Sequence, residues 1–292
     1  MKRIINLSLA ALAASSLILA GCGKKADAGT KIKNIGSDTM LQIGLSWSEA
    51  YAKVEPAVSV EVNGGGSGVG IAGLIDGTAD IANSSRAFEE KEIADLKAKK
   101  NVEPKEFMVG YDALCIFVHK DNPLNEISIE QLAEIYKDGG KFRKWSDLGI
   151  TVPSGKDEIV VLSRQNTSGT QHYFKEAVVG KKATQRPDVL QQSGSSEVVQ
   201  VITKTPGAVG YSGMGFITPD VKVVKVSKKT GDPGIAPSIA TTLDKTYPIS
   251  RPMFVYTAGE PAPHVKKYID WMLGDAGQAI LKDNHYVPLP KK

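Results

Sequence analysis

Four short polar stretches of this sequence combine hydroxyl side chains, glycine backbone and, in two of them, an arginine. They are residues 37–40, 64–70, 84–86 and 164–170. Hydroxyls and backbone amides donate hydrogen bonds, and a guanidinium adds a fork of N–H donors that matches two oxygens of one anion. The combination indicates a site for a small tetrahedral or planar oxyanion.

Each serine or threonine taken alone is explained as well by a helix cap or a turn. Caps do not require arginines beside them, however, and Arg86 and Arg164 stand within two of these stretches. The set as a whole therefore favours anion binding.

Other chemistries fit the same residues less well. Gly68, Gly70 and Gly73 satisfy a G-x-G-x-x-G pattern, but the glycines before them make the loop too long for a dinucleotide turn. Ser67 lacks the flanking glycines of a nucleophile elbow, because position 69 is valine. The four histidines show no metal-ligand spacing, and His172 is interpreted as a helix-surface residue. We expect no metal, no cofactor and no catalytic residue.

The polar stretches must be positioned by alternating strands and helices. Strands are predicted at 32–35, 58–62, 80–82 and 159–162, with helices at 40–53, from 71, at 88–100 and at 171–179. This alternation predicts an α/β fold with a mostly parallel sheet flanked by helices. In such folds ligands bind at the carboxyl ends of the strands, where helix N-termini favour negative charge.

Two longer apolar strands, 107–119 and 250–257, interrupt this rhythm. We interpret them as crossings between two lobes. Lobe 1 then comprises residues 31–113 plus 247–292, and lobe 2 comprises residues 114–246. A discontinuous first lobe places both hinges side by side, which permits closure over a ligand.

The N-terminal segment is predicted to be an export signal rather than part of the fold. Residues 1–21 begin with Lys2 and Arg3 and continue as an apolar run, which is typical of such a signal. The alternative interpretation is an anchor that is retained and spans the membrane once. The final Leu-Ala-Gly-Cys resembles the lipobox of bacterial lipoproteins, which makes Cys22 the lipidated residue and 22–30 a tether. Cys115, in an apolar run, is then expected to be buried and inert.

Composition limits the classes of partner. The 292 residues contain 36 Lys+Arg against 32 Asp+Glu, a formal charge of only +4, so a nucleic-acid partner has no electrostatic support. Two cysteines exclude a disulfide framework and a four-cysteine metal site.

Five motifs resemble those of the phosphate-binding proteins of bacterial phosphate ABC importers. They are GSDTM at 36–40, GSG at 66–68, DIANSSR at 80–86, RQNTSGT at 164–170 and PGAVGY at 206–211. The resemblance implies a two-lobed, type II periplasmic-binding-protein fold with two hinge crossings. It also implies a non-enzymatic, monomeric receptor that binds inorganic phosphate and delivers it to a membrane permease. The lipid anchor would hold it on a bacterial membrane, on the periplasmic or outer face.

The resemblance assigns roles residue by residue. Thr39 would give its hydroxyl and Met40 its amide, Ser67 would cap the helix after the glycine loop, and Arg164 would bind from lobe 2. The full set of expected phosphate-binding residues is Ser37, Thr39, Met40, Ser67, Ser84, Ser85, Arg86, Asp112, Arg164, Ser168, Gly169 and Thr170.

One position departs from part of the family. Some members carry an aspartate, which accepts the proton of hydrogen phosphate, where this chain has Ser85. Either another carboxylate takes this role or discrimination against sulfate is weaker. Asp112 is our preferred candidate, because Asp38 is well placed simply to cap its helix. A receptor or sensor for another oxyanion and an exported phosphoesterase on the same scaffold remain alternatives.

Overall fold

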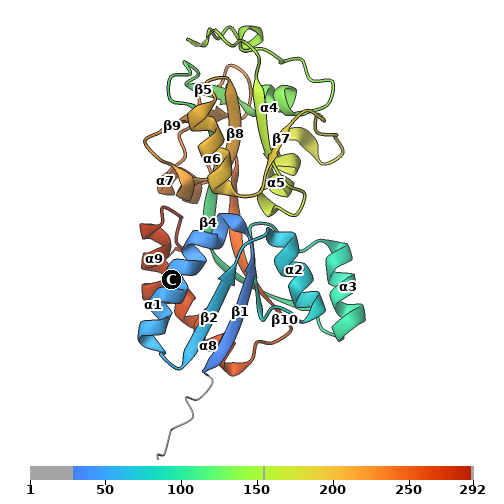
Figure 1. Ribbon diagram of the computed structural model, residues 1–292, viewed down its shortest axis with the longest axis vertical. Helices are drawn as coiled ribbons and strands as arrows, with labels where there is room; N and C mark the ends of the chain where they lie inside the picture. Colours follow the sequence, from blue (N-terminus) through green and yellow to red (C-terminus); the bar gives the residue numbers. More distant parts are fainter. Residues whose placement is uncertain (1–28, 154, 291–292) are drawn as a thin grey trace, which may run out of the picture.

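The computed structural model describes residues 29–153 and 155–290. Figure 1 shows two lobes, with strand β4 (Pro104–His119) at the waist between them. The predicted export signal and Cys22 lie outside the described residues. Within the described ranges, no helix is both long enough and apolar enough to span a membrane.

The lower lobe in Figure 1 is built on strands β1 (Thr30–Gly36), β2 (Val58–Asn63) and β3 (Ile81–Ser84). β1 pairs in parallel with both β2 and β3, and β10 (Ser250–Ala258) adds antiparallel to β3. Its helices are the 3₁₀ turn Asp38–Met40, α1 (Leu41–Val54), α2 (Ser67–Asp76), α3 (Glu90–Lys100), α8 (Pro263–Leu273) and α9 (Asp275–Asp283).

The upper lobe contains the remaining described strands. They are β5 (Glu126–Ser128), β6 (Val160–Arg164), β7 (Leu190–Gln192), β8 (Ala208–Gly213) and β9 (Val221–Ser227). β6 is parallel to β7 and β8, whereas β4 is antiparallel to β8 and β9. The helices are α4 (Ile129–Tyr136), α5 (Gly169–Phe174), the π-helix Lys175–Gly180, α6 (Ser195–Lys204) and α7 (Ile239–Leu243), with 3₁₀ turns at Trp145–Leu148 and Met214–Phe216.

Strand β4 links the two lobes by changing its partner. Up to Ala113 it pairs with β10, and from Leu114 it pairs with β8. The return connection runs alongside, because the Leu114 amide donates to the Ile249 carbonyl at 2.8 Å just before β10 begins. The consequence is that two adjacent strands carry the chain between the lobes.

Strand β4 is held in place by burial in the hydrophobic core. Its residues from Leu114 to Val118 are all fully buried, as expected for a strand covered on both faces. Cys115 lies among them as a free thiol, and burial raises its pKa well above the ordinary value. The expectation that Cys115 is buried is confirmed, and the raised pKa disfavours the reactive thiolate.

Of the element boundaries that differ from the sequence-based expectation, two concern polar residues of the cleft. α2 begins at Ser67 rather than near residue 71, because Gly66 adopts φ 100° and turns the chain directly into the helix. The helix expected at 171–179 begins at Gly169 and becomes a π-helix after Phe174. Both changes move polar residues from loops into first helical turns.

Candidate functional site

Residues from both lobes meet where β1, β3 and β6 end. The lower lobe supplies Ser37 and Thr39 after β1, Ser67 at the start of α2, and Ser85 after β3. The upper lobe supplies Thr170 in the first turn of α5. All five side chains are buried. The strand ends thus collect the hydroxyls that the sequence separates by more than a hundred residues.

Hydrogen bonds link these residues to one another. Ser37 Oγ donates to Ser85 Oγ at 2.9 Å, and the Ser85 amide donates to Ser67 Oγ at 3.1 Å. Thr39 Oγ1 and Thr170 Oγ1 are 2.5 Å apart, which joins the two lobes. Each hydroxyl has one proton, which can turn from its present acceptor toward an oxyanion.

Arg164 lies at the end of β6, with 1% exposure. Its Nη1 donates to Ser195 Oγ at 2.8 Å and its Nη2 to Asp38 Oδ2 at 2.9 Å. Nε is buried and has no hydrogen-bond partner among the described residues. Burial lowers the pKa of this guanidinium, and the Asp38 carboxylate opposes that effect.

Asp38 does not act as a helix cap. The N-cap position of its turn is Ser37, with no side-chain cap bond, and Asp38 Oδ1 instead accepts from the Gly65 amide at 2.9 Å. Since Oδ2 accepts from Arg164, Asp38 bridges the lobes. The capping interpretation of Asp38 is wrong, because tertiary partners satisfy both carboxylate oxygens.

Two more expected roles differ in the structure. Ser67 is the first residue of α2 rather than its cap, and it accepts a bond from Ser85. The Met40 amide donates to the Ser37 carbonyl at 3.0 Å. Ser168, by contrast, does cap α5, because its Oγ accepts from the Gln171 amide.

Arg86 faces acidic side chains of α3 rather than an open position. Its Nη2 and Nη1 donate to Glu92 at 2.6 Å and 2.8 Å. Burial alone would lower the pKa of Arg86, but Glu92 and Glu89 outweigh that effect and raise the pKa above its ordinary value. Ser84 Oγ donates to the Arg86 carbonyl at 2.7 Å, which stabilises this turn.

Asp112 lies in β4 and is fully buried. Its Oδ1 accepts from the Met214 amide at 3.0 Å, and its Oδ2 accepts from Arg251 Nη2 at 2.9 Å and Nε at 3.2 Å. Burial raises the pKa of this carboxyl, whereas Arg251 acts in the opposite direction. Three of about four acceptor positions are therefore occupied.

Arg251 is the residue that the sequence analysis missed. It is 2% exposed and also donates to the Ser85 carbonyl and to Thr170 Oγ1. One feature of the sequence could have identified Arg251, namely that it is an arginine within an otherwise apolar strand predicted to cross between the lobes.

The lobes are in contact across the site. The Gly68 amide donates to the Thr167 carbonyl at 3.0 Å, and a Cβ added to Gly169 would lie 2.3 Å from Ser67 Oγ. His172 Nε2 of α5 lies 3.0 Å from Glu89 Oε1 beside α3. The described conformation is thus closed.

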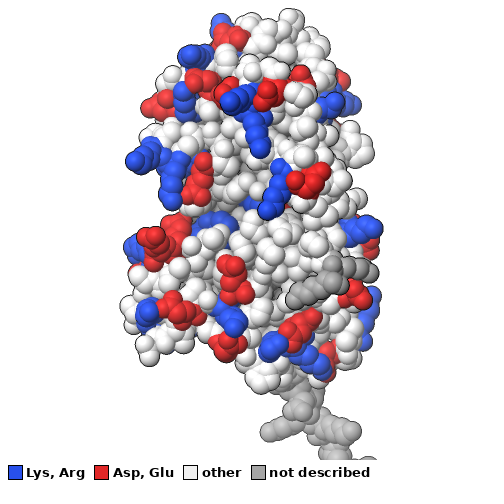
Figure 2. All heavy atoms as spheres, turned by 180° about the vertical axis from the view of Figure 1, so that it is seen from behind, with Lys and Arg blue, Asp and Glu red and all other residues white. Residues whose placement is uncertain are grey.

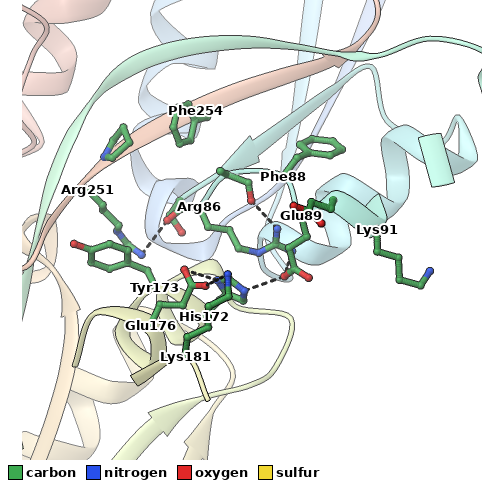
Figure 3. A pocket seen from close by; sticks show the side chains of 14 residues that line it. Arg86, Phe88, Glu89, Lys91, His172, Tyr173, Glu176, Lys181, Arg251 and Phe254 are labelled. Atoms are coloured by element: carbon green, nitrogen blue, oxygen red, sulfur yellow. Dashed lines mark hydrogen bonds and ion pairs between the residues drawn. The ribbon is translucent and has the colours of Figure 1, made fainter. Parts of the chain in front are cut away.

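Beside the hydroxyls lies a cavity of about 620 Å³. Figure 3 shows Arg86 and Glu89 facing His172 and Glu176 across it, with Arg251 and Tyr173 at another wall. Ser85 and Arg251 line this cavity and also contact the hydroxyl cluster. On the molecular face in Figure 2, acidic and basic side chains are interspersed, so no single-sign patch extends from the cleft over that face.

The two lobes, the parallel strand ends at the cleft and the paired crossings define the type II periplasmic-binding-protein fold, as predicted. The sequence model of the PBP superfamily domain matches residues 23–276. The phosphate-binding protein PstS of Pseudomonas aeruginosa is 33% identical over 271 residues, covering 89% of this chain and 84% of that protein. PstS of Bacillus subtilis is 30% identical over 306 residues, covering 99% and 95%.

Solved structures agree with these relatives. A phosphate ABC transporter substrate-binding protein from Clostridium perfringens with bound phosphate has a TM-score of 0.80 at 27% identity, covering 89% of this chain and 100% of that one. A phosphate transport receptor from Vibrio cholerae has a TM-score of 0.69 at 27% identity, with 89% and 100% coverage. The chain belongs to the PBP superfamily and, within it, to the PstS family of phosphate-binding proteins.

Proposed function

We propose that this protein binds inorganic phosphate between its lobes and delivers it to the permease of a phosphate ABC importer. The observation that carries the proposal is Arg164, a buried arginine whose Nε–H has no described partner. An unpaired buried donor is costly, and a bound oxyanion would satisfy it.

The proposed ligand shell combines this guanidinium with hydroxyls from both lobes. One lobe contributes Ser37, Thr39, Ser67 and Ser85. The other lobe contributes Ser168, the Gly169 backbone and Thr170. The start of α2 adds the positive end of a helix dipole. We retain Met40, Ser84, Arg86 and Asp112 as candidate ligands, although each is engaged within the protein in the closed conformation.

The proposed lobes are residues 31–113 plus 247–292 and residues 114–246. Support comes from the change of β4 partner at Ala113 and Leu114 and from the adjacent Ile249 connection. Rotation about these two strands would open the cleft, admit the anion and close over it.

A receptor role agrees with the names of the relatives better than an enzymatic role does, since those proteins are named as phosphate-binding and transport proteins. We propose a monomer that performs no catalysis. The lipobox-like sequence supports a location on a bacterial membrane, on its periplasmic or outer face, with diacylated Cys22 as the anchor.

Calorimetry of the Cys22→Ser protein against phosphate, arsenate, sulfate and molybdate tests the ligand. We expect saturable one-to-one phosphate binding, and Arg164→Met should lower the affinity about 100-fold because charge-assisted bonds are lost. Arg143→Met, which removes a surface partner of Asp188, serves as the matched control and should bind like the wild type. Unchanged affinity in Arg164→Met would contradict the proposed site, and turnover of a generic phosphoester would favour the phosphoesterase.

Membrane fractionation tests the anchor. The wild-type protein should sediment with membranes, whereas Cys22→Ser should move to the soluble fraction because the acylated sulfur is gone. A variant that still sediments with membranes would indicate a retained apolar span instead.

A further inference from the structure

Arg251 occupies a position that contacts both lobes and both crossing strands. It lies on β10, its carboxylate partner Asp112 lies on β4, and both are essentially inaccessible to solvent. Nη1 donates to the Ser85 carbonyl in the lower lobe at 3.2 Å. Nη2 donates to Thr170 Oγ1 in the upper lobe at 2.9 Å.

Tyr173 fixes the same region from the upper lobe. Its ring lies 5.5 Å from the guanidinium carbon of Arg251, an arrangement visible in Figure 3. Its hydroxyl donates to the Ser250 carbonyl at 2.6 Å. Helix α5 therefore contacts β10 through the backbone beside Arg251 as well as through the guanidinium itself.

The bond from Arg251 restricts what the Thr170 hydroxyl can do. A hydroxyl has one proton and two acceptor lone pairs. Because Arg251 N–H occupies one lone pair, the Thr170 proton points away from the arginine. It is then available to Thr39 Oγ1, 2.5 Å away, or to an oxyanion between the lobes.

Only a fork of donors can make these contacts together. The guanidinium binds Asp112 with Nε and Nη2 and still reaches Thr170 and Ser85. A lysine ammonium would keep the charge opposite Asp112, but it is a point donor on a flexible stem.

We propose that Arg251 is a positioning residue for oxyanion binding. Anchored by Asp112, it orients the Thr170 hydroxyl as a donor to the bound anion, and it does so only when α5 has closed onto β10. The inference rests on the proposed phosphate function and adds a residue and a role to it.

A double-mutant cycle on the full chain carrying Cys22→Ser tests this role, with inorganic phosphate as the probe in calorimetry. Arg251→Lys should lower the phosphate affinity at least about tenfold. With Thr170→Val, which lacks the hydroxyl, adding Arg251→Lys should change the affinity less than about twofold. With Thr170→Ser, which keeps the hydroxyl, the tenfold loss should return.

Equal losses in the Thr170→Val and wild-type backgrounds would overturn the proposal, because a merely structural arginine acts independently of that hydroxyl. Unchanged affinity in Arg251→Lys would overturn it as well. If Arg251→Lys does not fold by circular dichroism, the uncharged pair Asp112→Asn with Arg251→Gln takes its place in the same cycle. Absence of oxyanion binding by the wild-type protein would overturn the proposed function and this role with it.

Discussion

Each buried arginine at the cleft is matched by a carboxylate. Arg164 pairs with Asp38, and Arg251 pairs with Asp112. Because each arginine charge is balanced by its carboxylate, an anion between the lobes meets hydrogen-bond donors but little net positive charge. Affinity should then come from directed hydrogen bonds rather than from a long-range field, which agrees with the interspersed surface charges in Figure 2.

Away from the cleft, the buried Arg186 and the exposed Asp188 form an ion pair whose strength depends on pH. Asp188 accepts from Arg186 Nε at 2.6 Å, and this bond lowers the pKa of Asp188 from 3.8 to about 2. The lower folded-state pKa means that the stabilisation is complete above roughly pH 4 and is lost as the pH falls toward 2. Because Asp188 is exposed, we expect a contribution of no more than about 1 kcal/mol.

Asp188→Asn should therefore lower the free energy of unfolding more at about pH 6 than at about pH 2, as measured by urea denaturation. Asp220→Asn changes another exposed carboxylate and is the control. A difference of equal size at both pH values would contradict this origin.

At the scale of elements, the site depends on where helices begin. α2 and α5 start directly after Gly66 and Ser168, and their first turns carry Ser67, Gly169 and Thr170. A helix that began a turn later, as the apolar pattern suggested for α2, would leave Ser67 in a loop. The starting residues thus decide which groups face the other lobe.

The caps of α5 and α4 allow stability and binding to be separated. Ser168 caps α5 at the site, and Ser128 caps α4 in a reciprocal capping box with Gln131. Either serine changed to alanine should reduce the free energy of unfolding by about 0.5–2 kcal/mol, because an N-cap bond is lost.

Only Ser168→Ala should also weaken phosphate binding, by about tenfold. Urea denaturation of the ligand-free proteins and phosphate calorimetry measure the two effects. Equal affinities of the two variants would show that Ser168 serves as a cap alone.

At the scale of the whole molecule, contact between the lobes brings the two halves of the proposed site together. Gly169 of the upper lobe approaches Ser67 and Ser85 of the lower lobe so closely that an added Cβ would lie 2.3 Å and 2.8 Å from their hydroxyl oxygens. This contact exists only between lobes. A side chain at position 169 should therefore oppose closure while leaving each lobe intact.

Gly169→Ala is expected to lower phosphate affinity at least about 100-fold while the ligand-free stability stays within about 1 kcal/mol, since alanine suits a helix. Small-angle scattering should show that phosphate no longer reduces the radius of gyration. Gly274→Ala, with φ −79° and no atom nearer than 3.4 Å to the new Cβ, is the control. Normal compaction of Gly169→Ala with phosphate would refute the closure argument.

The sequence by itself determined the α/β class, the two crossing strands and the stretches that supply the hydroxyls and Arg164. These features are local, because strand and helix periodicity, glycine turns and short motifs lie within about fifteen residues of chain. Family membership could be predicted from the sequence for the same reason, since each of the five motifs is one continuous stretch of chain.

Only the tertiary structure decided which charges meet. Arg86 turns to Glu92, Asp38 bridges to Arg164, and Arg251 joins Asp112 to Thr170. The partners Arg251 and Asp112 are separated by 139 positions in the chain, and Arg164 and Asp38 by 126. Ion pairing and desolvation depend on three-dimensional neighbours, which no local pattern encodes.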